Sequence, residues 1–209
     1  MPEGPVLVDS DIFVLLAGAR LLDRALALLG FSRDSSRRLP ALPHMLARGR
    51  KFAQLMNPQT RKLALGACET VPEIADRPGD EVFQQLLDVP DIDAGEAVLY
   101  GLLAEQPACV LASADKRAMQ AVGSQPELTG VRQRVAGRVI CLETVLELLM
   151  RHDGVEATAH AFAVFPQYKT FQVVFSSHNA TDQARCLASL RSYLRDLKRQ
   201  VGDDFLRQL

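Results

Sequence analysis

The chain has 209 residues, with 24 basic and 25 acidic side chains and a net charge of −1. Hydrophobic residues make up 48% and charged residues 23%, which is typical of a globular protein and argues against a disordered chain. No window approaches the ~20 consecutive apolar residues of a membrane span, and the first residues lack the pattern of a signal peptide. We therefore expect a cytoplasmic protein without membrane association, with one α/β domain and a modest extension.

Taken in chain order, the apolar patterns predict alternating strands and helices. A first buried strand over 5–8 is rich in valine and ends at Asp9. Helical spacing follows from 12 to 29, and we expect Gly18 to interrupt it and Gly30 to end it. This beginning is typical of an α/β protein, in which each strand is followed by a helix.

The middle of the chain is less regular at first. A helical stretch is predicted over 39–55, whereas 57–77 contains several breakers and 82–89 fits a helix or a strand equally well. The clearer elements that follow are a helix over 93–105, a strand over 108–112, a helix over 116–122, a strand over 139–141 and a helix over 145–151. This alternation predicts a three-layer α/β sandwich with a mostly parallel central sheet and right-handed crossovers.

After residue 151 the pattern changes, so we expect a domain over 1–151 and a mainly helical C-terminal extension over 152–209. Residues 152–164 are predicted to be helical. An added edge strand or hairpin is predicted from the alternation of Phe171, Val173 and Phe175.

Apolar residues at helical spacing predict a last helix, with Asn179 or Thr181 available to cap its start. These apolar residues are Leu187, Leu190, Leu194, Leu197 and Val201. The helix packs on its own domain in one interpretation and pairs with another chain, such as a second copy in a homodimer, in the other.

The cysteines and histidines show no metal-binding pattern. Cys68, Cys109, Cys141 and Cys186 are widely separated and form no CxxC pair, and the histidines form no HxxxH motif. We expect the cysteines to be small buried apolar residues and expect no structural zinc site.

Charge is unevenly distributed along the chain. Between residues 33 and 62 the charged residues are basic except Asp34, and between 69 and 96 they are acidic except Arg77. This suits a protein that holds a polyanion near divalent cations, with Arg48, Arg50 and Lys51 as candidate RNA contacts. Two solvated faces that partly neutralise each other would produce the same pattern.

Acidic residues stand where strands end and where a helix begins. Asp9 and Asp11 follow the first strand, Asp115 follows another, and Glu96 lies in the first turn of a helix. Ligands of parallel sheets bind outside the carboxyl ends of the strands, so we expect these side chains to share one crevice. Clustered carboxylates repel each other, and Mg²⁺ or Mn²⁺ would relieve that repulsion, activate a water and neutralise a phosphodiester transition state.

A structural alternative exists for each of these acids. Aspartate is a preferred N-cap, so Asp9, Asp11 and Asp115 could cap the helices that follow them. Asp93 and Glu96 have the spacing of a capping box. The grouping of the acids at the strand ends favours the metal site over the capping interpretation.

Segments 6–11, 93–97 and 111–115 resemble the three acidic motifs of PIN domains, and the strand and leucine-rich helix from residue 138 resemble the end of that fold. The resemblance covers about residues 5–151. It implies an Mg²⁺- or Mn²⁺-dependent ribonuclease, in many members the toxin of a bacterial toxin–antitoxin pair that binds an antitoxin protein.

The same resemblance implies roles for individual residues. Asp9, Glu96 and Asp115 would be the catalytic, metal-binding acids, with Asp11 as a supplementary metal ligand. Ser113 would hydrogen-bond the acid cluster. Asp93 is a supporting residue.

The chain departs from the PIN pattern at two points. Many PIN domains carry another acid in the helical segment after the first strand, and residues 35–54 contain none. No acid closely follows Asp115, where Lys116 stands instead. Asp11, Asp93 or Glu143 could compensate.

Two alternatives therefore stay open. The first is a catalytically weak or inactive PIN-like module that binds RNA or a protein. The second is a haloacid-dehalogenase-like phosphatase, because Asp9, Ser10 and Asp11 also resemble the nucleophile motif of that family. That family expects Thr or Val where this chain has Phe13.

Overall fold

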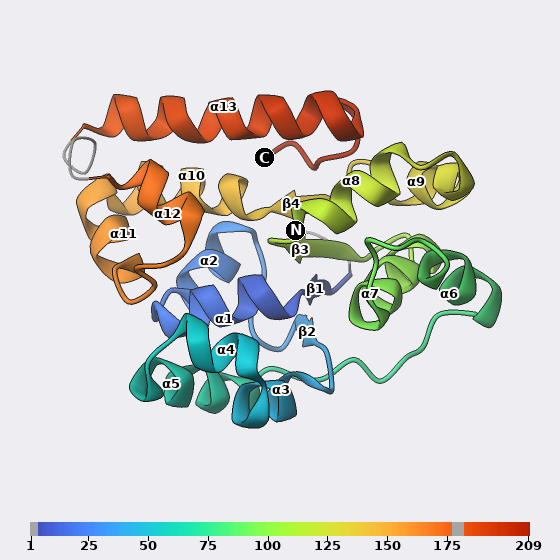
Figure 1. Cartoon of the computed structure of the whole chain (residues 1–209), viewed down its shortest axis with the longest axis horizontal. Coiled ribbons are helices and arrows are strands. Elements are labelled where there is room, and N and C mark those ends of the chain that lie inside the picture. Colours follow the sequence, from blue (N-terminus) through green and yellow to red (C-terminus); the bar gives the residue numbers. More distant parts are fainter. Residues whose placement is uncertain (1–3, 177–181) are drawn as a thin grey trace.

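A four-stranded sheet in the order β2-β1-β3-β4 forms the centre of the chain in the computed structural model, which describes residues 4–176 and 182–209 (Figure 1). The strands are β1 (Val6–Val8), β2 (Ser36–Arg38), β3 (Val110–Ser113) and β4 (Val139–Cys141). All pairings between these strands are parallel, with Val8 opposite Ala112 and Ser113 opposite Cys141.

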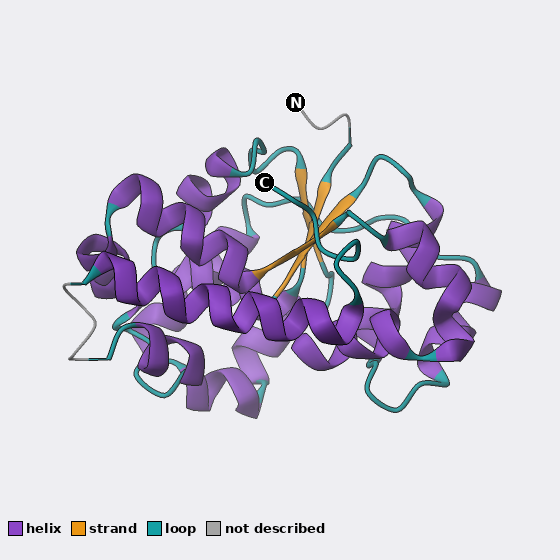
Figure 2. Ribbon diagram, turned by 90° about the horizontal axis from the view of Figure 1, so that it is seen from above, coloured by secondary structure: helices purple, strands orange, loops and turns teal. Residues whose placement is uncertain are grey.

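Helices cover both faces of this sheet (Figure 2). Successive side chains of a strand point to opposite faces, and Val6 and Val8 belong to one apolar core whereas Leu7 belongs to the other. Because both faces are covered, β1, β3 and β4 are buried along their whole length and are apolar except for Ser113 at the end of β3. The predicted three-layer α/β sandwich is confirmed.

The first core lies against helices from the N-terminal half and from the chain after β4. These helices are α1 (Ser10–Gly18), α2 (Leu22–Leu28), α3 (Leu42–Arg48), α4 (Arg50–Leu55), α5 (Pro58–Cys68), α10 (Leu142–Asp153), α11 (Val155–Phe162) and α12 (Lys169–Val174). The second core lies against α6 (Asp80–Leu87), α7 (Ala94–Glu105), α8 (Lys116–Ser124), the short 3-10 helix η1 (Pro126–Leu128) and α9 (Thr129–Val135).

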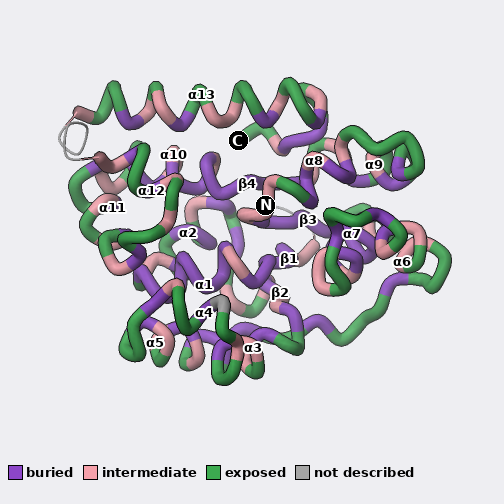
Figure 3. The backbone as a smooth tube through the Cα atoms, in the orientation of Figure 1, coloured by how far each residue is buried: buried purple, intermediate pink, exposed green. Residues whose placement is uncertain are grey.

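The last helix, α13 (Gln183–Val201), contributes to both cores. Its Leu190 packs into the first core and its Leu197 into the second. Buried and exposed positions alternate along α13, which lies beside α8 and α10 (Figure 3). The interpretation in which this helix packs on its own chain is therefore confirmed, while the domain boundary at residue 151 stays a prediction.

The cap of α13 differs from the expected one. Asn179 and Thr181 lie outside the described residues, and Asp182 is the N-cap, whose side chain accepts a hydrogen bond from the backbone N–H of Arg185. The chain after α13 returns to the sheet, where the Arg207 N–H donates to the Val139 carbonyl at 2.8 Å.

The expected edge strand through Phe171, Val173 and Phe175 is wrong, because this segment forms α12. Phe171 lies in an aromatic cluster, with ring centroids 4.4 Å from Phe162 and 4.6 Å from Tyr168. A helix places Phe171 in that cluster and leaves Val173 exposed. Tertiary packing therefore overrides the weak alternation of the sequence.

Other elements resolve what the sequence left open or blurred. The helical stretch over 39–55 is two helices that break at Gly49, and the open segment over 82–89 is mostly α6. Strand β2 has no apolar residue, so its pattern did not predict a strand. All four cysteines are buried, as expected. Within the described residues, no helix has both the length and the apolar character that a membrane span requires.

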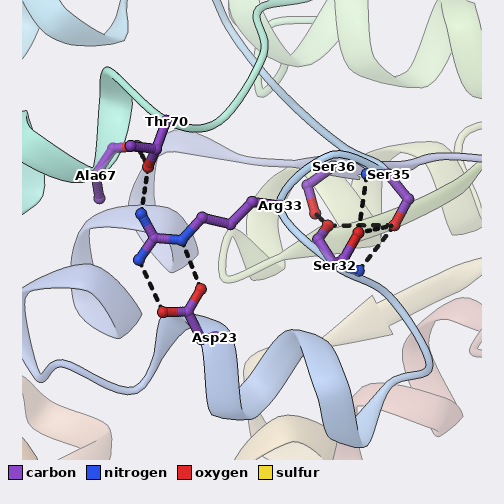
Figure 4. A network of polar contacts seen from close by, with 7 residues as sticks. All are labelled: Asp23, Ser32, Arg33, Ser35, Ser36, Ala67 and Thr70. Atoms are coloured by element: carbon purple, nitrogen blue, oxygen red, sulfur yellow. Dashed lines mark hydrogen bonds and ion pairs between the residues drawn. The ribbon is translucent and has the colours of Figure 1, made fainter.

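Part of the basic stretch fastens β2 to the rest of the molecule. The Arg33 guanidinium donates to both carboxylate oxygens of Asp23, at 2.5 and 2.8 Å, and to the Thr70 hydroxyl (Figure 4). The Arg38 guanidinium donates to the Cys68 carbonyl at 3.0 Å. These arginines therefore connect β2 with α2 and with the end of α5. Their guanidinium groups bind partners within the fold.

Arg20 occupies a backbone conformation that favours glycine. It follows α1 with a φ of 60°, and the next N–H, that of Leu21, donates to the Leu16 carbonyl at 2.8 Å. This is the pattern of a Schellman cap, whose left-handed position is usually glycine. A side chain with a Cβ is strained there by about 1 kcal/mol.

We expect Arg20→Gly to raise the free energy of unfolding by about 1 kcal/mol, since it removes this strain. Urea denaturation measures the change. Gly30→Ala is the matched control with the opposite effect. Gly30 has a φ of 85°, so the substitution introduces the strain that Arg20→Gly removes. It should lower the stability by a similar amount, and a gain in stability from Gly30→Ala would contradict the described conformation.

Candidate active site

A cleft of about 850 Å³ opens at the carboxyl edge of the sheet. Its lining includes Asp9, Asp11, Glu96 and Asp115, which come from three separate segments of the chain. The structure therefore brings together the four acids that were expected to share one crevice. Asp93 lies on the rim of the same cleft.

Asp9 is placed by the end of β1. Its backbone N–H donates to the Ala112 carbonyl of β3, and its carbonyl accepts from the Phe13 N–H in the first turn of α1. Because Val8 is opposite Ala112, Asp9 faces Ser113, whose hydroxyl donates to Asp9 Oδ2 at 2.9 Å. This is the hydrogen bond that the PIN resemblance implies for Ser113.

The Asp9 carboxyl is buried and titrates abnormally. Burial is the main cause that raises its pKa from 3.8 to about 7, and the neighbouring charge of Asp11 adds to the effect. The hydrogen bond from Ser113 acts in the opposite direction. The Asp9 side chain makes no capping hydrogen bond to α1, so the capping alternative does not explain why an aspartate stands at this position.

Glu96 and Asp93 form the capping box that was the structural alternative for them. The Glu96 N–H donates to Asp93 Oδ1 at 2.9 Å, and the Asp93 N–H donates to Glu96 Oε2 at 2.8 Å. Burial is nevertheless the main cause that raises the pKa of Glu96 to about 8. The hydrogen bond from the Asp93 N–H lowers this pKa, and the charge of Asp115 raises it further. Glu96 thus caps α7 and belongs to the acid cluster as well.

Asp115 likewise caps the helix that follows it. Its Oδ1 accepts from the N–H groups of Arg117 and Ala118, at 2.9 and 3.2 Å. Its own N–H donates to the Ser113 hydroxyl at 3.1 Å. Ser113 therefore links the acid that follows β1 to the acid that follows β3.

No group of three Asp, Glu, His or Cys side chains stands in metal-holding geometry among the described residues. Two of the acids use one carboxylate oxygen for capping, since Glu96 Oε2 and Asp115 Oδ1 accept hydrogen bonds from backbone N–H groups. The donor chemistry still fits Mg²⁺ or Mn²⁺, which prefer carboxylate oxygens.

Two buried hydroxyl groups beside the acids have no hydrogen-bond partner in the described part of the chain. One is Ser10 Oγ at the cleft, and the other is the phenol of Tyr100. Tyr100 lies one helical turn after Glu96 on α7, and burial raises the pKa of its phenol with a contribution from the charge of Asp9. An unsatisfied buried hydroxyl costs about 1–3 kcal/mol, so a polar ligand at the acids would stabilise this arrangement.

The remaining residues of the expected site lie elsewhere. Arg48 and Arg50 are exposed where α3 meets α4 and do not line the cleft, and the Lys51 side chain falls outside what the structure describes. Among the described residues, the basic side chains of the cleft are Arg77 and Arg117. These two were not predicted as contacts.

No family model, no curated protein and no solved structure matches the chain. The PIN resemblance, the toxin–antitoxin role and the antitoxin partner therefore stay predictions. Function has to be inferred from the cleft and its acids.

Proposed function

We propose that the chain is a metal-dependent nuclease that hydrolyses phosphodiester bonds of RNA in the acidic cleft. The observation that carries the proposal is the convergence of Asp9, Asp11, Glu96 and Asp115 on one cleft at the carboxyl edge of the sheet. Asp9 is buried without an ion pair among the described residues. A buried carboxylate is stable as an anion when a cation compensates it.

The four acids and Ser113 would each have a role in the reaction. Asp9, Glu96 and Asp115 would hold Mg²⁺ or Mn²⁺, with Asp11 as a further ligand, and the bound ion would activate a water and neutralise phosphate charge. Ser113 would orient the Asp9 carboxylate through its hydroxyl. The cleft is too acidic to accept a polyanion without such a cation.

Arg77 and Arg117 are suited to contact the phosphates of the substrate. Both line the cleft, and the Arg117 side chain is 78% exposed, with a guanidinium nitrogen 3.7 Å from Asp115 Oδ2. Guanidinium groups bind phosphate oxygens in bidentate geometry, so these arginines would position the strand beside the acids.

The test is incubation of the purified protein with labelled single-stranded RNA and Mn²⁺, beside the variants Asp9→Asn and Asp115→Asn. We expect both variants to cleave about a hundredfold more slowly or not at all, because they lose metal ligands. Asp91→Asn, at an exposed position of the same cleft, is the matched control and should cleave as the wild type does. Equal cleavage by all four proteins would point to contamination and remove the site assignment.

A second candidate function is an inactive module that binds RNA or a protein. The capping bonds of Glu96 and Asp115 favour it, because both carboxylates have partners without a metal ion. Titration with Mn²⁺ separates the two: a nuclease binds the ion in an Asp9-dependent manner, and the module does not.

A further inference from the structure

A fifth acid, Glu143, stands at the same edge of the sheet, on the far side of Asp115 from Asp9. Ser113 of β3 is opposite Cys141 of β4, and each strand is followed two residues later by an acid, Asp115 and Glu143. Neighbouring strands lie ~4.8 Å apart, so Asp9, Asp115 and Glu143 follow three adjacent strands along one edge.

Glu143 is already paired with a cation of the chain. Its side chain is 2% exposed, and Lys116 Nζ lies 2.6 Å from Glu143 Oε1. A carboxylate this deeply buried is strongly destabilising without a partner. Lys116 therefore neutralises the acid that could have compensated for the missing PIN position.

The Lys116 ammonium is held from several sides. Its backbone directly follows Asp115 at the start of α8, its ion-pair partner lies on α10, and the ring of Tyr193 on α13 is centred 4.5 Å away. A cation over an aromatic face gains about 0.5–2 kcal/mol. The C-terminal helix thus helps to fix a positive charge next to a proposed metal ligand.

The electrostatics of a second tyrosine connect Glu143 with the acid cluster. Tyr168, which precedes α12, is half-buried, and the pKa of its phenol is raised mainly by burial, with contributions from four nearby charges. These charges belong, in decreasing order of effect, to Asp11, Glu143, Asp115 and Asp9. Glu143 and three acids of the cleft therefore all lie close enough to the Tyr168 hydroxyl to raise its pKa.

We propose that Lys116 is a built-in cation that pairs with Glu143, so that the acid site binds one divalent ion, whereas the four cleft acids together with a free Glu143 would bind two. The inference rests on the proposed metal site. It assigns Glu143 and Tyr193 as positioning residues, which act through Lys116. An ordinary structural ion pair between α8 and α10 would have no effect on the number of ions bound.

The test is the number of Mn²⁺ equivalents bound per chain, measured by titration calorimetry and by the electron paramagnetic resonance signal of free Mn²⁺. We expect one equivalent for the wild type and for Lys116→Arg, which keeps the charge. Lys116→Met frees the Glu143 carboxylate and should bind two. The double variant Lys116→Met/Glu143→Gln removes that carboxylate as well and should return to one.

One equivalent for Lys116→Met, with Asp9-dependent binding intact in the wild type, would overturn this inference and leave the proposed function standing. No binding by any of the proteins would remove both. If Lys116→Met does not fold, Glu143→Gln is the variant to measure. It leaves the Lys116 ammonium without its carboxylate partner next to the metal site. Its Mn²⁺ affinity should fall about tenfold through repulsion, and an unchanged affinity would refute the role of Lys116.

Discussion

Asp9→Asn is expected to stabilise the folded chain at pH 8 by a free energy on the order of 4 kcal/mol, although it removes a proposed catalytic residue. The wild-type carboxyl has a pKa near 7 in the folded chain, mainly because it is buried, against 3.8 as its ordinary value. Its charge at pH 8 is therefore unfavourable in the fold, and asparagine carries no charge.

The direction of the pH dependence follows from the same shift. Between about pH 4 and pH 7 the folded chain keeps a proton on Asp9 that the unfolded chain has released. Stability is therefore greatest in acid and is lost as the pH rises through this range. Glu96, raised from 4.5 to about 8 mainly by burial, extends the loss toward pH 8.

Urea denaturation from pH 5 to pH 9 measures both effects. The wild type should lose stability across this range, and Asp9→Asn should lose less, because the contribution of Glu96 remains in the variant. At pH 8, Mn²⁺ at about 100 times its dissociation constant should raise the free energy of unfolding of the wild type by about 2.7 kcal/mol. It should raise that of Asp9→Asn only slightly. Parallel pH profiles for the two proteins would show that the Asp9 carboxyl is not desolvated as described.

Gly123→Ala is expected to destabilise the chain by about 2–3 kcal/mol, although alanine is the better helix former. Gly123 lies on α8 against the end of α13, where an added Cβ would be 2.6 Å from Val201 Cβ and 2.7 Å from its Cα. Because the Cα belongs to the backbone, no side-chain rotation relieves the overlap. The two helices would have to separate.

The matched control is Gly130→Ala on α9, where an added Cβ meets nothing within 4 Å. It should stabilise the chain by about 0.5–1 kcal/mol, the ordinary gain of alanine over glycine in a helix. Thermal unfolding followed by circular dichroism compares the two variants with the wild type. A gain in stability from both substitutions would mean that α13 does not pack against α8.

The elements that the sequence predicted well are those with a local signal. The valine-rich run before Asp9 and the apolar run before Asp115 are strands because their burial on both faces leaves a continuous apolar pattern. The capping box of Asp93 and Glu96 is equally local, since three residues contain it.

The elements that the sequence did not predict depend on contacts between distant segments. Strand β2 is polar and is held by pairing with β1, and α12 is selected by the aromatic cluster around Phe171. Tyr100 has the helical spacing from Glu96 that could have placed it beside the acids. Tyr168 and Tyr193 have no such signal, because they reach the site from the far end of the chain.

The contribution of α13 to both cores has a consequence for biosynthesis. The ribosome makes the four strands before it makes residues 186–206, which supply Cys186 and Leu190 to one layer and Leu197 and Phe205 to the other. Until those residues emerge, both layers present uncovered apolar surface, and Lys116 lacks its aromatic support. We therefore expect the nascent chain to be prone to aggregation, and its candidate active site to be incomplete, until those residues have emerged.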